Sequence, residues 1–141
     1  MDAFDADVLI YAAVAGHEPG RRVRALFRAA PADATPVGVG SVLLVPELLT
    51  KPLRDGAADE LAELGSLLGR LHLLPVDEAT AELAAALGAG YGLRAADAVH
   101  LATAVGAGAD RFVTDNRSDF PKSIREIDVV YPQELPDPAD P

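Results

Sequence analysis

The chain has 141 residues, half of them hydrophobic, which suits a single domain with its own hydrophobic core. It contains no cysteine, so disulfides, thiolate zinc sites and cysteine nucleophiles are excluded. A formal net charge of −10 argues against sequence-independent binding of nucleic acid through a broad basic surface. Nucleic acid remains open as a substrate, because divalent cations bound to acidic residues reverse the local charge.

No segment of the sequence resembles a signal peptide. No apolar stretch reaches the roughly 18 to 20 residues that a membrane-spanning helix needs. We therefore expect a cytoplasmic protein without a membrane partner.

The start of the chain predicts a short buried strand followed by a helix. The strand ends at about residues 4–5, and the helix begins near Asp7, whose side chain suits a helix cap. Asp5 then lies at the strand end, where parallel sheets place their ligands. The alternative is that Asp5 and Asp7 are only turn and capping residues.

Residues 18–30 have the spacing of an amphipathic helix, with arginines on its polar side. This is the densest basic patch of the chain, and we interpret it mainly as a solvated face. Residues 36–40 predict a second strand or turn.

The next helix is predicted over residues 42–50, capped by Ser41 and stopped by Lys51-Pro52. Pro46 should kink this helix or move its start later. Glu47 is the only charged residue among residues 42–49, and a buried Glu is rare without a partner. Further elements are predicted as a leucine-striped helix at 55–71, a strand at 73–76 and a helix at 78–87.

A single carboxylate, Asp97, lies within the apolar helical pattern of residues 93–105. An ionised carboxylate is costly to desolvate unless it is paired, hydrogen-bonded or bound to metal. The alternative is an acid in the first turn of a helix, where it complements the helix dipole. We interpret His100, one turn further on, as a surface or core histidine rather than a functional one.

A strand at residues 111–114 leads into a turn that contains Asp115, Asn116 and Asp119. These residues follow a strand end, as Asp5 does, although such side chains also build turns by bonding their own backbone. Residues 127–131 predict a last strand. Residues 133–141 form an acidic, Pro-rich tail that is either disordered or lies along the surface.

Strands alternate with helices through most of the chain, which predicts an α/β fold with a mainly parallel sheet of four to five strands. Connections of this type bring the ends of the first and fourth strands to the same edge of the sheet. We find no internal repeat and no second domain in the sequence.

The acidic residues are far apart in the sequence, but all of them offer oxygen ligands for a metal ion. Oxygen ligands without cysteine suit Mg²⁺, or Mn²⁺ as the alternative, better than Zn²⁺. Because Mg²⁺ takes one or two carboxylates and keeps several waters, four acids could hold one or two ions. A divalent cation there would activate water and neutralise charge on a scissile phosphodiester. Mutual repulsion should raise the pKa of some of these acids when no metal is bound.

Four segments together resemble the PIN-domain ribonucleases: Asp5-Ala-Asp7 followed by Val-Leu-Ile-Tyr, the isolated Glu47, the segment around Asp97, and Val-Thr-Asp-Asn-Arg-Ser-Asp-Phe at 113–120. At this size the chain resembles the VapC-type toxins of bacterial toxin–antitoxin pairs. The resemblance implies a three-layer α/β/α fold around a twisted, mainly parallel sheet. It spans a nuclease domain at residues 1–132, followed by the acidic tail at 133–141.

The resemblance also implies functional residues. Asp5, Glu47 and Asp97 would be catalytic ligands of Mg²⁺, and the fourth acid would be Asp115 or Asp119, or would be absent. Residues implied to orient ligands, bound water or substrate are Asp7, Thr114 and Asn116. The resemblance further implies endonuclease action on RNA, homodimerisation, and inhibition by an antitoxin that occupies the active-site groove.

The strongly negative net charge is unfavourable for RNA binding, so individual Arg and Lys side chains would have to contact the RNA. The candidates are Arg21, Arg24, Arg28, Arg111, Arg117, Lys122 and Arg125. Two other functions stay open. One is a catalytically inactive PIN-like α/β module that acts through protein–protein binding, and the other is a metal-dependent phosphatase of small substrates.

Overall fold

The computed structural model describes residues 1–31 and 35–138. Within these residues five strands form one sheet of order β3-β2-β1-β4-β5, and every neighbouring pair is parallel. The strands are β1 (Asp2–Phe4), β2 (Gly38–Ser41), β3 (Leu71–Leu74), β4 (Arg111–Val113) and β5 (Asp128–Val130). The predicted parallel α/β fold is confirmed, and the first and fourth strands are direct neighbours.

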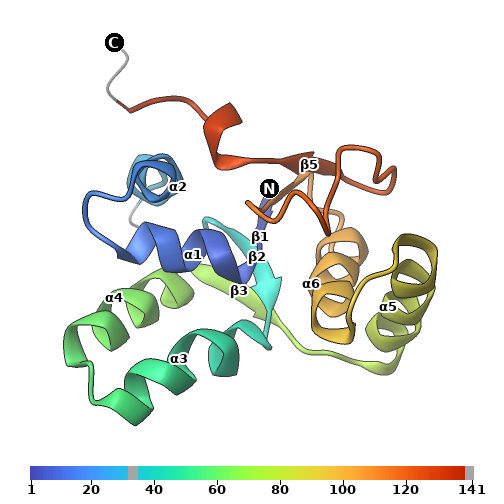
Figure 1. Cartoon of the computed structure of the whole chain (residues 1–141), viewed down its shortest axis with the longest axis horizontal. Coiled ribbons are helices and arrows are strands. Elements are labelled where there is room, and N and C mark those ends of the chain that lie inside the picture. The colour runs from blue at the N-terminus through green and yellow to red at the C-terminus, as the bar shows by residue number, and fades with distance from the viewer. Residues whose placement is uncertain (32–34, 139–141) are drawn as a thin grey trace.

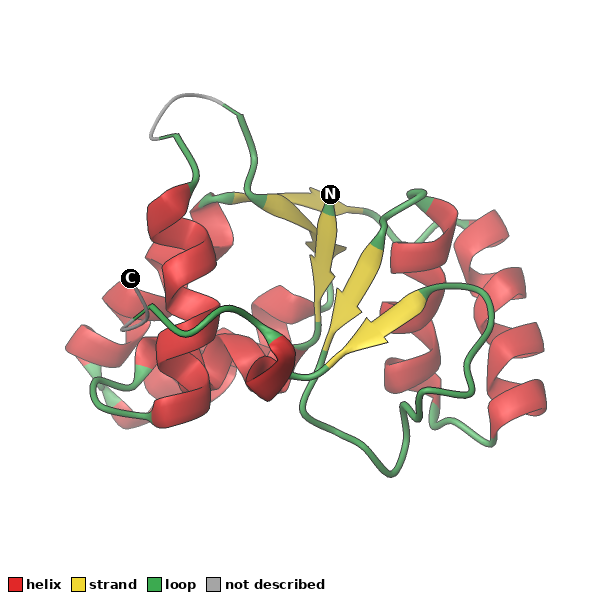
Figure 2. Ribbon diagram, turned by 90° about the horizontal axis from the view of Figure 1, so that it is seen from above, coloured by secondary structure: helices red, strands yellow, loops and turns green. Residues whose placement is uncertain are grey.

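Helices cover both faces of the sheet, which gives three layers (Figures 1 and 2). One face carries α1 (Ala6–Ala13), α2 (Glu18–Ala29), α3 (Leu44–Asp55) and α4 (Ala58–Gly69), and the other carries α5 (Glu78–Tyr91) and α6 (Ala95–Gly106). Alternate strand residues point to opposite faces. Phe4 therefore joins the core under α1 to α4, whereas Ala3 and Phe112 join the core under α5 and α6.

The helix around Pro46 and its successor differ from the prediction. α3 begins at Leu44, so Pro46 lies in the first turn, where no intrahelical N–H is required. The prediction that Pro46 moves the helix start is confirmed, but Ser41 is not the cap: its Oγ accepts a hydrogen bond from the Leu43 N–H at 3.1 Å. α3 also runs through Pro52 to Asp55, and the left-handed Gly56 ends it. The following helix therefore starts at Ala58 rather than at residue 55.

Two further boundaries are corrected by packing. β3 covers Leu71–Leu74 rather than residues 73–76, since it pairs in register with β2. α5 continues past residue 87 to Tyr91, and Gly92 ends it in the left-handed conformation. Gly88 lies inside this helix on the side that packs against α6: a Cβ at Gly88 would lie 3.4 Å from the Ala98 Cβ.

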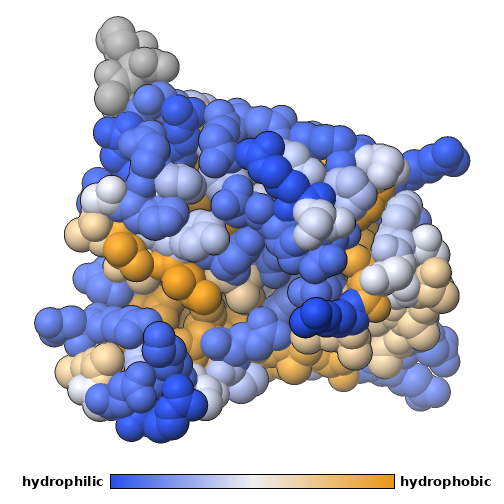
Figure 3. All heavy atoms as spheres, viewed as in Figure 1, coloured by the Kyte–Doolittle hydropathy of each residue, from blue (hydrophilic) through white to orange (hydrophobic). Residues whose placement is uncertain are grey.

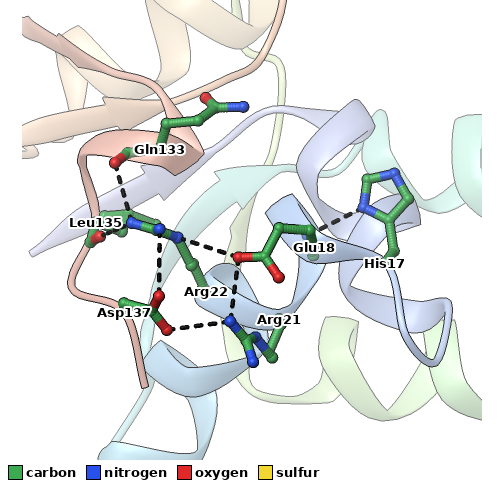
Figure 4. Close-up of polar contacts among 8 residues, drawn as sticks. His17, Glu18, Arg21, Arg22, Gln133, Leu135 and Asp137 are labelled. Atoms are coloured by element: carbon green, nitrogen blue, oxygen red, sulfur yellow. Dashed lines mark hydrogen bonds and ion pairs between the residues drawn. The ribbon is translucent and has the colours of Figure 1, made fainter. Parts of the chain in front are cut away.

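The end of the chain lies against α2 (Figure 4). After a short 3-10 helix (Pro132–Glu134), Leu135 is 2 % exposed and belongs to the core under α1 to α4. Arg22 Nη1 donates to the carbonyl oxygens of Gln133 and Leu135 at 3.1 and 2.9 Å, and Asp137 accepts from Arg21 at 3.1 Å. The tail therefore lies along the surface as far as residue 138, and residues 139–141 are outside the described range.

Within the described ranges, no helix combines the length and the apolar composition needed to cross a membrane.

Candidate functional site

Asp5 lies directly after β1, the central strand, and is the N-cap of α1 in place of the predicted Asp7. Its side chain is buried. Oδ1 accepts a hydrogen bond from the Ala6 N–H at 2.8 Å, and Oδ2 accepts one from the Thr114 hydroxyl at 2.8 Å. Burial raises the pKa of Asp5, the hydrogen bond from Thr114 opposes this, and repulsion from the nearby Asp97 carboxylate adds a smaller increase. The strand neighbours β1 and β4 thus bring Asp5 and Thr114 together.

The turn after β4 is built by its own polar side chains, as the sequence suggested. Thr114 Oγ1 accepts from the Asn116 N–H at 3.1 Å. The Asn116 amide donates to Asp119 Oδ2 at 2.8 Å, and its Oδ1 accepts from the Ser118 hydroxyl at 3.2 Å. Asn116 therefore fixes the direction of the Asp119 carboxylate.

Asp97 lies in the first turn of α6. Because α6 leads into the amino end of β4, its own N-terminus lies at the carboxyl edge of the sheet, next to Asp5. The burial of Ala98 packs the helix so that the Asp97 side chain remains partly exposed. Burial raises the pKa of Asp97, and repulsion from Asp119 and Glu47 raises it further. Together with Asp5, whose pKa is affected by Asp97, these two residues make three candidate acids that interact electrostatically with Asp97.

Glu47 reaches the site from α3 and meets His100 of α6. Its side chain is 34 % exposed, so the expectation of a buried Glu is wrong, but it does have a partner. His100 Nε2 lies 3.1 Å from both Glu47 Oε1 and Glu47 Oε2. His100 is buried, which is one of the two environments predicted for it, yet it contacts a candidate ligand, which was not predicted. The only signal for it was the three-residue spacing from Asp97, which puts both side chains on one helix face.

Asp7 and Asp115 form a separate pair beside this group. Asp7 Oδ2 accepts from the Asp115 N–H at 3.0 Å, and its Oδ1 accepts from the Val8 N–H at 2.7 Å. Burial, followed by repulsion from Asp5, raises the pKa of Asp7 to about 7, and Asp115 adds a smaller repulsion. Asp115 is thus next to Asp7, whereas Asp119 is next to Asp97.

The donor set fits a hard divalent cation. In the described part of the chain, no three His, Cys, Asp or Glu side chains lie close enough together to share one ion as they stand. Mg²⁺ retains several waters, so carboxylates that do not all touch the ion can still hold it through bound water. Burial is the main cause of the raised pKa values of Asp5 and Asp97, and repulsion between nearby carboxylates adds to it, so a bound cation would favour the ionised form of both side chains.

Several of the cations that the sequence offered for RNA binding are held by other groups. Arg24 donates to the carbonyl oxygens of Ala12 and Val14 at 2.7 and 3.3 Å. Arg111 forms a two-pronged ion pair with Asp2, at 2.8 and 2.9 Å. These arginines, together with Arg21 and Arg22 of the tail contact, stabilise the fold, so the basic row of α2 is not simply a solvated face.

Two exposed arginines border the acidic group. Arg117 lies in the turn after β4, where its guanidinium stacks over the Tyr131 ring, 4.4 Å from the centroid, and donates to Gln133 Oε1 at 2.7 Å. Arg94 is the N-cap of α6, and its charge lowers the pKa of Asp97. Arg94 was not among the sequence candidates, although its position three residues before Asp97 placed it at the same helix end.

This geometry defines an α/β protein with several acidic side chains at the carboxyl edge of a parallel sheet. The family model described as PIN domain matches residues 3–123. The chain therefore belongs to the PIN-domain family, and the resemblance predicted from its motifs is confirmed.

Solved structures show the same fold. A chain of a toxin–antitoxin complex from Klebsiella pneumoniae is 25 % identical, with a TM-score of 0.73 over 96 % of this chain and 100 % of that one. A chain of the crystal structure of VapBC2 from Rickettsia felis bound to a promoter DNA fragment is 15 % identical, with a TM-score of 0.69 over 92 % and 97 %. A chain of FitAcB from Neisseria gonorrhoeae is 21 % identical, with a TM-score of 0.69 over 96 % and 100 %. No curated protein sequence matches this chain significantly.

Proposed function

We propose that this protein is a Mg²⁺-dependent endoribonuclease and the toxin of a toxin–antitoxin pair, with Mn²⁺ as an alternative cofactor. One observation carries the proposal: three acids gather at the carboxyl edge of a PIN-domain sheet, namely Asp5 after β1, Asp97 in the first turn of α6, and Glu47, which contacts His100 of α6. The similarity to a chain of a Klebsiella pneumoniae toxin–antitoxin complex supports the toxin assignment.

In this proposal Asp5 and Asp97 are the principal cation ligands, and Glu47 is the third. Asp5 is the rigid one, because hydrogen bonds from Ala6 and Thr114 fix both of its oxygens. Asp97 is the partly exposed acid that faces an incoming phosphate. When bound, the cation would activate water and neutralise the charge that develops on the scissile phosphate.

We assign the fourth carboxylate to Asp119 rather than to Asp115. The Asp119 charge raises the pKa of Asp97, and Asn116 orients its carboxylate by a 2.8 Å hydrogen bond. Asp115 contacts Asp7 instead, through its backbone N–H. Asp7 and Asp115 then support the turn that holds Asp119 without contacting the cation.

The proposed protein partner is an antitoxin, and the proposed assembly is a homodimer. An exposed apolar surface supports a partner at α1: Ile10 of the helix is 42 % exposed and Val14, its C-cap, is 50 % exposed. Figure 3 shows apolar residues on this face of the molecule. Co-expression with the product of the adjacent reading frame, followed by light scattering, tests both points. A monomer that never co-purifies with that product would refute them.

A closed circular RNA tests the enzymatic part, because only internal cleavage linearises it. We expect linear products with Mg²⁺ and none with EDTA or with Asp97→Asn. A protein that binds no Mg²⁺ or Mn²⁺ in calorimetry and leaves RNA intact would instead be the inactive PIN-like binding module. Hydrolysis of p-nitrophenyl phosphate without RNA cleavage would identify the phosphatase.

A further inference from the structure

The contact between Glu47 and His100 joins the two helical layers at the acidic site. Glu47 comes from α3 and His100 from α6, which lie on opposite faces of the sheet. His100 is 3 % exposed, and its Nε2 faces both carboxylate oxygens of Glu47 at 3.1 Å. A buried ring therefore holds a partly exposed, flexible side chain.

Glu47 needs such an anchor, because the charges around it push it away. Its carboxylate and that of Asp97 carry the same charge, and their repulsion contributes, after burial and Asp119, to the raised pKa of Asp97. A Glu side chain that is 34 % exposed can relieve this repulsion by rotating into solvent. The hydrogen bond from His100 opposes that rotation and keeps a third carboxylate facing Asp97.

The other ring nitrogen identifies the direction of the hydrogen bond. His100 Nδ1 is buried and has no hydrogen-bond partner among residues 1–31 and 35–138. A proton on Nδ1 would be a buried donor without an acceptor, which is costly. The proton therefore belongs on Nε2, which donates it to Glu47. Each Glu47 oxygen keeps lone pairs that are free to bind a cation.

We propose that His100 is a positioning residue that holds the Glu47 carboxylate at the cation site. The inference rests on the proposed function in one respect, that a divalent cation binds this acidic group. It assigns to His100 no contact with the cation or with RNA. Residues that orient metal ligands typically affect metal affinity by about 10- to 100-fold.

The test is calorimetric titration of the metal-free protein with Mn²⁺. We expect His100→Leu to weaken Mn²⁺ binding at least about tenfold. His100→Gln, which keeps an N–H donor at a similar reach, should restore most of the affinity. His100→Asn, whose amide is too short to reach Glu47, should behave like His100→Leu and replaces it if the leucine variant does not fold. His72→Leu, at an exposed histidine of β3, is the matched control.

A second arm asks whether His100 acts through Glu47. In a Glu47→Gln background, His100→Leu should cause no further loss of Mn²⁺ affinity, because the carboxylate that it positions is gone. Full affinity in both His100→Leu and His100→Asn, or an additive loss in the Glu47→Gln background, would overturn the inference. A wild-type protein that binds no Mn²⁺ would overturn the inference and the proposed function together. Normal wild-type binding with unaffected His100 variants would overturn the inference alone.

Discussion

The Thr114 hydroxyl donates a hydrogen bond to Asp5 Oδ2 at 2.8 Å and so joins residues 109 positions apart. Both side chains are buried, at the ends of the neighbouring strands β1 and β4. The same hydroxyl oxygen accepts from the Asn116 N–H, so it also anchors the turn that carries Asp119. Thr114 thus orients one acid directly and a second through Asn116.

Thr114→Val keeps the shape of the side chain but removes the donor to Asp5 and the acceptor for Asn116. We expect a loss of unfolding free energy on the order of 1 to 3 kcal/mol, the cost of leaving a buried polar group without its hydrogen-bond partner. Urea unfolding at neutral pH measures it. Thr114→Ser retains the hydroxyl and serves as the control. Equal stability of the valine variant and the wild type would contradict the role of this hydrogen bond.

Asp97→Asn should abolish RNA cleavage while leaving the fold intact. The variant loses a helix-dipole interaction of about 0.3 to 1 kcal/mol but also relieves repulsion from Asp119 and Glu47. Its unfolding free energy in EDTA should therefore stay within about 1 kcal/mol of the wild-type value. Glu82→Gln, at an exposed acid of α5, is the control for charge loss alone. Undiminished cleavage by Asp97→Asn would refute the site assignment.

Asp119→Asn and Asp115→Asn are a matched pair that identifies the fourth acid. The Asp119 carboxylate repels that of Asp97, a proposed ligand, whereas the Asp115 carboxylate repels that of Asp7. We therefore expect only Asp119→Asn to weaken Mn²⁺ binding and RNA cleavage strongly. Calorimetry and initial cleavage rates on the two variants measure this. The reverse order of effects would move the fourth position to Asp115.

The stability of the metal-free protein should fall as the pH rises from about 4 to about 7. The pKa of Asp7 is about 7 in the folded protein and 3.8 ordinarily, so across this interval the folded state binds the proton and the unfolded state releases it. The stabilisation is complete below the ordinary pKa and is lost as the pH passes the folded value. It amounts to a few kcal/mol, about 1.4 kcal/mol for each pKa unit.

Urea unfolding in EDTA across this pH range measures the effect. The pKa values of Asp5 and Asp97 are also raised, so Asp7→Asn should reduce the slope without abolishing it. An unchanged slope in Asp7→Asn would show that Asp7 ionises normally. Addition of Mg²⁺ at neutral pH should raise the unfolding free energy, since a ligand that binds only the folded state stabilises it.

The tail contributes to stability through Leu135. Leu135→Ala empties a position that is 2 % exposed, and we expect it to cost about 2 to 5 kcal/mol. Leu53→Ala, at a leucine that is 62 % exposed, should change stability by less than about 0.5 kcal/mol. Thermal unfolding compares the two. A Leu135→Ala variant as stable as Leu53→Ala would mean that the tail does not pack on α2 in solution.

The local pattern of the sequence was sufficient for the alternation of strands and helices, the parallel sheet and the family. Glu47 and Asp97 stood out because each is a single charge in an apolar helical pattern, where desolvating a charge is costly. Asp5 stood out because it follows a predicted strand end. Boundaries were less predictable where contacts between elements override local propensity. α3 passes through Pro52, and α5 passes through Gly88, where it packs against α6.

Only the tertiary structure decided which distant groups meet. His100 is an ordinary helix residue in the sequence, and its contact with Glu47 exists because α3 and α6 converge on one sheet edge. The separation of Asp119 from Asp115 likewise follows from the fold of one turn, through the amide of Asn116 and the backbone of Asp115. The physical reason is that the type of a residue determines how costly its burial is. Which group compensates a buried charge depends on how distant elements are connected and packed, and the local sequence does not encode this.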